Sequence, residues 1–326
     1  MTTAPLRTAP PFDAELNTVL KVVNESISPT LLPEHLPVLR GPGFTPTLEQ
    51  LLEGRAIEHE ERWIPGPAGD LLISIFRPRE QGTSTKPAGP GLFFTHVGGL
   101  IFGDRFVGVG PVVDLVEPLG AVVVTVEYRL APENPAPAAA EDSYAALVWT
   151  AEHADELGID PERLITIGGS AGGGLTAAIT LMARDRGLPA LAGQVLMYPM
   201  LDEHNDSTSA RQIDGIGIWD RTSNDTGWNF ALGARRGTQD VSAYESPSRA
   251  SDLSNLPPTY LEVGSAEVFR DETVDYASRI WADGGDAELH VWPGGYHLFE
   301  LLAPEAALSR AARDTRNAWL ARLLQR

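Results

Sequence analysis

The sequence predicts an α/β protein built on a mostly parallel sheet. From residue 92 onward, its predicted strands are nearly continuous apolar runs, which is typical of strands buried on both faces. Helical segments of about ten residues or more lie between most of these strands, a pattern that favours right-handed parallel crossovers. At 326 residues, the chain is long enough for one large domain of this kind.

The N-terminal part is predicted to be helical and broken by prolines. Apolar Leu16, Leu20 and Val23 share one helical face within residues 12–54. The sequence pattern changes from helical to strand-like at Ile57, so we predict a helical cap segment over 1–55 and a catalytic domain over 56–326. Cap segments of this kind cover a site.

Eight strands are predicted along the rest of the chain. The first two, 57–64 and 71–77, flank a proline- and glycine-rich turn and should form an antiparallel hairpin. The other six are expected at 92–95, 121–126, 163–167, 194–198, 259–263 and 287–292. The polar interval between the sixth and seventh strands contains Gly and Trp residues, and we interpret about 203–250 as a cap insertion over the carboxyl edge of the sheet.

A candidate nucleophile lies where the fifth strand meets a helix. Gly168-Gly169-Ser170-Ala171-Gly172 matches G-x-S-x-G between an apolar strand and a helix from Ala171 to about Arg186. The glycines permit a sharp turn that exposes the Ser170 hydroxyl, and the helix N-terminus favours developing negative charge. The alternative is a glycine-rich turn or a phosphate-binding loop, but no Lys-Ser/Thr follows the glycines.

Serine needs a general base, and His297 is the histidine best placed to supply one. It follows the last predicted strand, at the sheet edge where sites of open α/β sheets assemble. The acid that orients this base should follow the seventh strand. Glu267 lies there with Asp271 as its competitor, although Asp271 also suits the first turn of a helix.

The turn after the third strand is the candidate oxyanion hole. In His96-Val97-Gly98-Gly99-Leu100, backbone amides can point into a site without obstruction by side chains. We expect the amides of Gly98, Gly99 and Ala171 to be the donors. Taken alone, the turn could equally be an ordinary loop with two glycines.

Composition excludes several classes of partner. The net charge of −19 would repel nucleic acid, and no apolar stretch approaches the length of a spanning helix. The first eleven residues lack the apolar core of a signal peptide, which predicts a cytoplasmic protein. There is no cysteine, the seven histidines show no metal-ligand spacing, and we expect neither a metal nor a cofactor.

These motifs resemble the hormone-sensitive-lipase-like group of α/β-hydrolase esterases, the bacterial family IV carboxylesterases. The resemblance runs from about residue 57 onward, in the order and spacing of that family, and rests on 96–99, 103–104, 127–135, 168–173, 198–199, 264–271 and 294–299. It implies an α/β-hydrolase fold, a serine esterase for short to medium acyl esters, and frequently a homodimer.

Three positions depart from the family pattern. Val97 replaces the first glycine of the usual His-Gly-Gly-Gly turn, which would strain the chain if φ were positive there. Gly169 replaces a commonly acidic residue, and Glu267 replaces the usual aspartate. We expect Val97, Leu100 and Trp219, the last from the predicted cap, to contact the substrate.

Two alternatives to an esterase remain open at this point. A lactonase or amidase could use the same triad, since pocket shape and leaving group decide the substrate. The family resemblance also includes hormone receptors that have lost the catalytic histidine, which makes a non-catalytic ligand-binding protein the second alternative. The presence of His297 argues against that alternative, whereas Val97 keeps it open.

Overall fold

A single eight-stranded sheet forms the centre of the protein. The computed structural model describes residues 8–41, 43, 45–79 and 88–325. The strands lie in the order β1-β2-β4-β3-β5-β6-β7-β8. Their bounds are β1 Ile57–Gly66, β2 Gly69–Pro78, β3 Gly89–Thr95, β4 Val122–Val126, β5 Ile159–Gly169, β6 Gly193–Met197, β7 Thr259–Gly264 and β8 Ala287–Trp292. The predicted fold class and all eight predicted strands are confirmed.

The pairing changes from antiparallel to parallel across the sheet. β1 and β2 form the predicted hairpin, and β2 also pairs antiparallel with β4 through Ile73↔Val126. All other neighbouring strands are parallel. Every residue of β4, β6 and β7 is buried, as the continuous apolar runs predict for strands covered on both faces.

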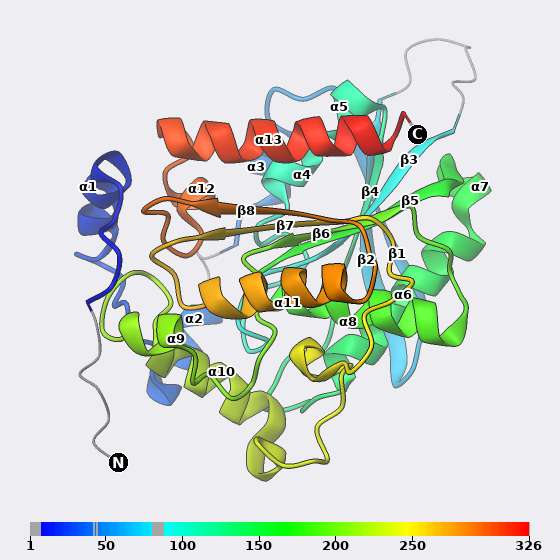
Figure 1. Cartoon of the computed structure of the whole chain (residues 1–326). Coiled ribbons are helices and arrows are strands. Elements are labelled where there is room, and N and C mark those ends of the chain that lie inside the picture. Colours follow the sequence, from blue (N-terminus) through cyan, green and yellow to red (C-terminus); the bar gives the residue numbers. More distant parts are fainter. Residues whose placement is uncertain (1–7, 42, 44, 80–87, 326) are drawn as a thin grey trace.

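Helices cover both faces of the sheet. In Figure 1, α13 (Ala307–Leu323) lies on one face, while α6 (Ala138–Glu152), α8 (Ala171–Arg186) and α11 (Arg270–Ala282) lie on the other. The remaining helices outside the cap segments are single turns: α4 Gly110–Val113, α5 Val116–Leu119, α7 Ala154–Leu157 and α12 Phe299–Leu302. No helix in the described ranges is both long and apolar enough to cross a membrane.

The two predicted cap regions contain short helices. The N-terminal one holds α1 Ala14–Val23, the 3₁₀ turn η1 Pro33–His35, α2 Leu36–Leu39 and α3 Leu48–Leu52. The Asp13 carboxylate caps α1 by accepting bonds from the amides of Glu15 and Leu16. The insertion holds α9 Thr208–Gln212, α10 Arg221–Leu232 and the 3₁₀ turns η2 Gly233–Arg235 and η3 Pro247–Arg249.

Hydrogen bonds join these two regions although nearly 200 residues separate them. The Leu31 amide donates to Ser223 Oγ at 2.7 Å, and the Thr226 hydroxyl donates to the Leu31 carbonyl at 3.0 Å. The two predicted cap regions therefore contact each other. The division into a segment 1–55 and a domain 56–326 stays a prediction, and residues 1–7, 42 and 44 of that segment lie outside the described residues.

Candidate active site

Ser170 occupies a strained turn between β5 and α8. Its φ is 55° and its ψ is −125°, a conformation that costs a residue with a side chain about 1–3 kcal/mol. The turn is held by β6, because the Ser170 amide donates to the Met197 carbonyl at 3.0 Å and the Met200 amide donates to the Ser170 carbonyl at 2.9 Å. Glycine is required at 168, where a Cβ would lie 2.4 Å from the Gly172 carbonyl oxygen.

His297 and Glu267 extend from Ser170 as a chain of hydrogen bonds. His297 Nε2 lies 3.0 Å from Ser170 Oγ, and His297 Nδ1 lies 2.5 Å from Glu267 Oε1. The second carboxylate oxygen of Glu267 accepts a bond from the Gly264 amide at 3.1 Å, which ties this side chain to the end of β7. All three residues are buried, so this chain of bonds is shielded from water.

Asp271, the competing acid, points elsewhere. It lies in the first turn of α11, and its carboxylate accepts a bond from the Ser209 amide at 2.8 Å and pairs with Arg270. The structure therefore brings Glu267 to His297 and directs Asp271 to α9.

The oxyanion turn presents unpaired amides next to Ser170. Positive φ falls on Gly98 (133°), Gly99 (60°) and Leu100 (67°), and not on Val97, so the strain considered for a β-branched residue at 97 does not arise. Neither the Gly98 nor the Gly99 amide donates to any described residue. Ala171 is the first residue of α8, so its amide has no partner within the helix.

Two aromatic rings hold this turn from behind. His96 stacks on Tyr128 with ring centroids 3.9 Å apart, His96 Nδ1 lies 2.8 Å from the Val97 carbonyl, and the Tyr128 hydroxyl donates to the His96 carbonyl. Burial lowers the pKa of His96 to about 4. His96 therefore stays neutral near pH 7 and supports the turn as a structural residue.

A largely apolar cavity of about 690 Å³ opens above these groups. Ser170 and His297 line it together with Val97, Gly98 and Gly99. Apolar side chains from both cap regions and the C-terminal helices complete the lining, among them Val23, Ile27, Leu31, Leu51, Ile218, Trp219, Leu301 and Leu302. This arrangement can bind an apolar acyl or alcohol group and hold a carbonyl between a hydroxyl nucleophile and three amide donors.

A protein-family model described as the alpha/beta hydrolase fold matches residues 92–301. The chain belongs to the α/β-hydrolase fold family. This confirms the resemblance drawn from the sequence motifs. The match includes the oxyanion turn, the Ser170 turn, Glu267 and His297, and therefore spans the whole candidate site.

Individual relatives of this α/β hydrolase are named as esterases. Esterase LipI of Mycobacterium tuberculosis is 34% identical over 235 residues, which are 70% of either chain. Carboxylic ester hydrolase LipN of the same organism is 36% identical over 254 residues, 75% of this chain and 66% of LipN. Among solved structures, a bacterial heroin esterase has a TM-score of 0.86 and 34% identity over 96% of this chain and 98% of that one.

Two of the three expected substrate contacts of this α/β hydrolase lie at the cavity. Val97 and Trp219 line it, and the Trp219 ring covers Gly99 closely enough that a Cβ there would lie 2.4 Å from the indole. Leu100 does not line the cavity. Its positive φ turns the chain so that its carbonyl accepts the Ala131 amide, and its side chain packs into the core.

Sequence reasoning missed most of the cavity wall. His35, from the N-terminal region, lines the cavity, and its Nδ1 accepts a bond from the Leu32 amide at 3.1 Å. Leu301 and Leu302 of α12 lie just beyond His297. Their proximity to His297 was a usable signal, whereas nothing in the sequence places the segment around His35 beside the distant residues Ser170 and His297.

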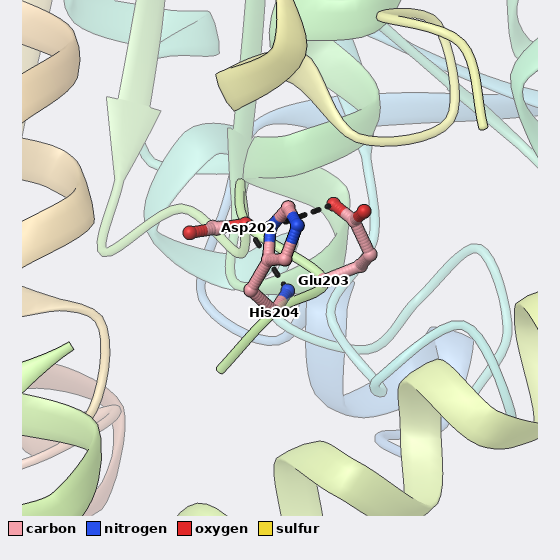
Figure 2. Close-up of side chains that lie close together, drawn as sticks. All are labelled: Asp202, Glu203 and His204. Atoms are coloured by element: carbon pink, nitrogen blue, oxygen red, sulfur yellow. Dashed lines mark hydrogen bonds and ion pairs between the residues drawn. The ribbon is translucent and has the colours of Figure 1, made fainter. Parts of the chain in front are cut away.

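Asp202, Glu203 and His204 form the one cluster of possible metal ligands found among the described residues (Figure 2). Their charges are already paired within the protein. Glu203 accepts from Arg249 Nε at 2.6 Å, and the Asp202 carboxylate lies 2.7 Å from His204 Nδ1. This bond raises the pKa of His204, which opposes metal binding because a metal ligand must be unprotonated. We assign no metal or cofactor to these residues.

Proposed function

We propose that this α/β hydrolase is a serine carboxylesterase for short to medium acyl esters. Ser170 is the nucleophile, His297 its general base, and Glu267 the acid that orients the imidazole and stabilises the imidazolium. One observation carries the proposal: the hydrogen bonds from Glu267 through His297 to Ser170 end at the floor of an apolar cavity.

The reaction has two parts. Ser170 Oγ attacks the ester carbonyl while His297 Nε2 takes its proton. The tetrahedral intermediate then collapses to an acyl-enzyme as the C–O bond breaks and His297 gives the proton to the departing oxygen, which leaves as the alcohol. Water activated by the same imidazole then releases the acid. We assign the oxyanion of each intermediate to the amides of Gly98, Gly99 and Ala171, and no cofactor takes part.

Two further findings support an ester substrate. LipI, LipN and the heroin esterase are each named for ester hydrolysis. The cavity wall is mostly hydrocarbon, which suits the apolar parts of an ester better than a charged or sugar substrate.

The test is hydrolysis of p-nitrophenyl esters by the purified chain at mildly alkaline pH. We expect turnover of the butyrate ester by the native protein and its loss in Ser170→Ala. Ser143→Ala is the matched control, because Ser143 is buried in α6 and its hydroxyl has no partner among the described residues. Equal rates in the native protein and Ser170→Ala would refute the proposal.

A series of substrates tests the acyl and leaving-group classes. We expect rates to peak between acetate and octanoate esters and to fall for dodecanoate, as the family resemblance to esterases of short to medium acyl chains implies. Faster turnover of a matched lactone or anilide would instead assign the same triad to lactone or amide cleavage.

Two expectations from the sequence remain as parts of this proposal. The resemblance predicts a homodimer, which sedimentation velocity at several concentrations would detect. The cytoplasmic location stays a prediction from the N-terminal sequence, and fractionation of the source cells would test it.

A further inference from the structure

Three charged side chains form a buried cluster behind His297. They are Glu262 on β7, Glu300 on α12 and Arg316 on α13, each about 2% exposed. Arg316 Nη1 lies 3.0 and 2.9 Å from the two carboxylate oxygens of Glu300 and also contacts Glu262 Oε1. Burying such charges is expensive, and apolar residues often replace them without loss of stability. Stability alone therefore does not explain the cluster.

The cluster connects the chain segments that carry His297 and Glu267. Glu300 lies three residues after His297. Glu262 lies on β7, five residues before Glu267, which follows the end of that strand. Arg316 bridges the two carboxylates. It therefore cross-links the segment that holds the base to the segment that holds the orienting acid.

Tyr198 gives the cluster a second contact with the site. Its hydroxyl donates to Glu300 Oε1 at 3.4 Å, and its ring meets the His297 imidazole edge-on with centroids 5.2 Å apart. Tyr198 follows β6 with a φ of 38°, directly beside the Ser170 turn. A shift of Glu300 would reach the imidazole through this ring as well as through the backbone.

The second carboxylate oxygen of Glu262 is also hydrogen-bonded. Glu262 Oε2 accepts from Trp292 Nε1 at 3.1 Å and from the Tyr260 hydroxyl at 3.2 Å. Trp292 is the last residue of β8, where the loop that carries His297 begins. The cluster thus anchors both ends of that loop, at Trp292 and at Glu300.

We propose that Arg316 is a positioning residue, which holds His297 in hydrogen-bond reach of both Ser170 and Glu267 by bridging Glu300 and Glu262. The inference rests on the proposed esterase function. None of the three clustered side chains lines the substrate cavity. Arg316 therefore acts on the chemical step and leaves substrate binding unchanged.

The charges of the cluster also resist separation of the two segments. One guanidinium faces two carboxylates, and burial raises the pKa of Glu262 to about 7 while Arg316 opposes that rise. The positive charge of Arg316 thus attracts both carboxylates and offsets part of the cost of burying them.

The first experiment separates kcat from KM. A phosphonate that labels the active serine counts competent sites, so that kcat refers only to folded enzyme. We expect Arg316→Met to lower kcat about 10- to 100-fold with KM unchanged, and Arg316→Lys to recover part of this loss because it keeps the positive charge but its ammonium does not extend as far as Nη1 of arginine. The control is Arg322→Met on the same helix, which breaks only an exposed pair with Glu288.

The second experiment needs no turnover. In ¹⁵N-histidine-labelled protein, with His297 assigned from His297→Asn, we expect Glu300→Gln to shift the ring ¹⁵N resonances of His297, since it weakens the bridge through Arg316 while keeping an acceptor for it. This variant preserves side-chain shape and keeps the proposal testable if Arg316→Met does not fold. It also remains informative if the native protein cleaves no ester and ignores the phosphonate, a result that would refute only the proposed function.

A purely structural role predicts a different result. The Arg316 and Glu300 variants would then melt at lower temperature and contain fewer titratable sites, but kcat per site and the ring ¹⁵N resonances of His297 would match the native protein. That result would overturn the inference.

Discussion

At the position of the proposed triad acid, Glu267 reaches His297 with a side chain one methylene longer than the aspartate that the family resemblance implies. The extra methylene is accommodated because Oε2 turns back to accept the Gly264 amide at 3.1 Å, which leaves Oε1 at 2.5 Å from His297 Nδ1. The acid is thus fixed at both oxygens, by Gly264 at the end of β7 and by His297 in the loop after β8. These two hydrogen bonds leave the Glu267 carboxylate little freedom to rotate.

Exchanging Glu267 for Gln should disable the base. Glutamine keeps the shape but favours the wrong imidazole tautomer, and we expect kcat to fall about 1,000- to 10,000-fold. Asp271→Asn is the control, since Asp271 bonds Ser209 and Arg270 instead. Steady-state kinetics on both variants decide the point, and a larger loss in Asp271→Asn would contradict the assignment.

The oxyanion turn offers a second test at a single position. A Cβ at Gly98 would lie 1.9 Å from the Phe102 carbonyl oxygen, at a φ of 133° that side chains rarely adopt. Gly98→Ala should therefore displace the turn and lower kcat about 100- to 1,000-fold, the usual loss for one oxyanion donor. Gly158→Ala also places a Cβ at positive φ but meets nothing within 4 Å. Similar losses in both variants would argue against a specific role for the turn.

Among the elements, α8 shows how closely a helix can approach a sheet when its first turn is glycine. A Cβ at Gly172 would lie 2.0 Å from the Thr95 carbonyl, and one at Gly174 would lie 2.2 Å from the Met200 carbonyl. The Thr95 hydroxyl also donates to the Gly172 carbonyl at 2.7 Å. This approach brings the α8 N-terminus beside the oxyanion turn, which starts directly after β3.

We expect Gly172→Ala to lower the free energy of unfolding by about 1–3 kcal/mol, because backbone atoms of β3 cannot move aside for a methyl group. Gly110→Ala at the start of α4 is the matched control. Its Cβ would meet only Leu51 Cδ2 at 3.9 Å, so stability should stay equal or rise slightly. Urea unfolding of both variants measures the difference, and equal stability of Gly172→Ala and the native protein would contradict the packing argument.

At the scale of the whole molecule, two buried groups give opposite pH dependences of stability. Burial lowers the pKa of His96 from 6.5 to about 4, so the unfolded chain binds more protons in that interval and stability rises with pH. Burial raises the pKa of Glu262 from 4.5 to about 7, so the folded chain binds more protons there and stability falls with pH. The two effects oppose each other between about pH 4.5 and 6.5.

Replacing either residue should reveal the pH dependence of stability that the other one causes. In Glu262→Gln, we expect the free energy of unfolding to rise with pH between about 4.5 and 6.5 by up to about 1.4 kcal/mol per pH unit more than in the native protein. In His96→Asn, it should fall with pH by a comparable amount relative to the native protein. Urea unfolding at several pH values checks both slopes, and parallel curves for all three proteins would refute the assignment.

Much of the fold was predictable because its signals are local. A proline- and glycine-rich turn marked the β1–β2 hairpin, apolar runs marked most of the other strands, and β8 and α8 begin and end where predicted. The G-x-S-x-G turn could be predicted from the sequence for the same reason, because its tight geometry requires glycine at 168 and 172. The order of the sheet, with β3 between β4 and β5, has no such local signal.

The sequence by itself determined the fold class, the family and the residues from which a triad could be built. Only the tertiary structure decided that Glu267 and not Asp271 reaches His297, that Leu100 packs into the core, and that Arg316 bridges Glu262 and Glu300. Strand and turn signals come from residues next to each other in the chain. These choices join side chains that lie up to 54 residues apart, so they depend on how helices and loops pack once the sheet has formed.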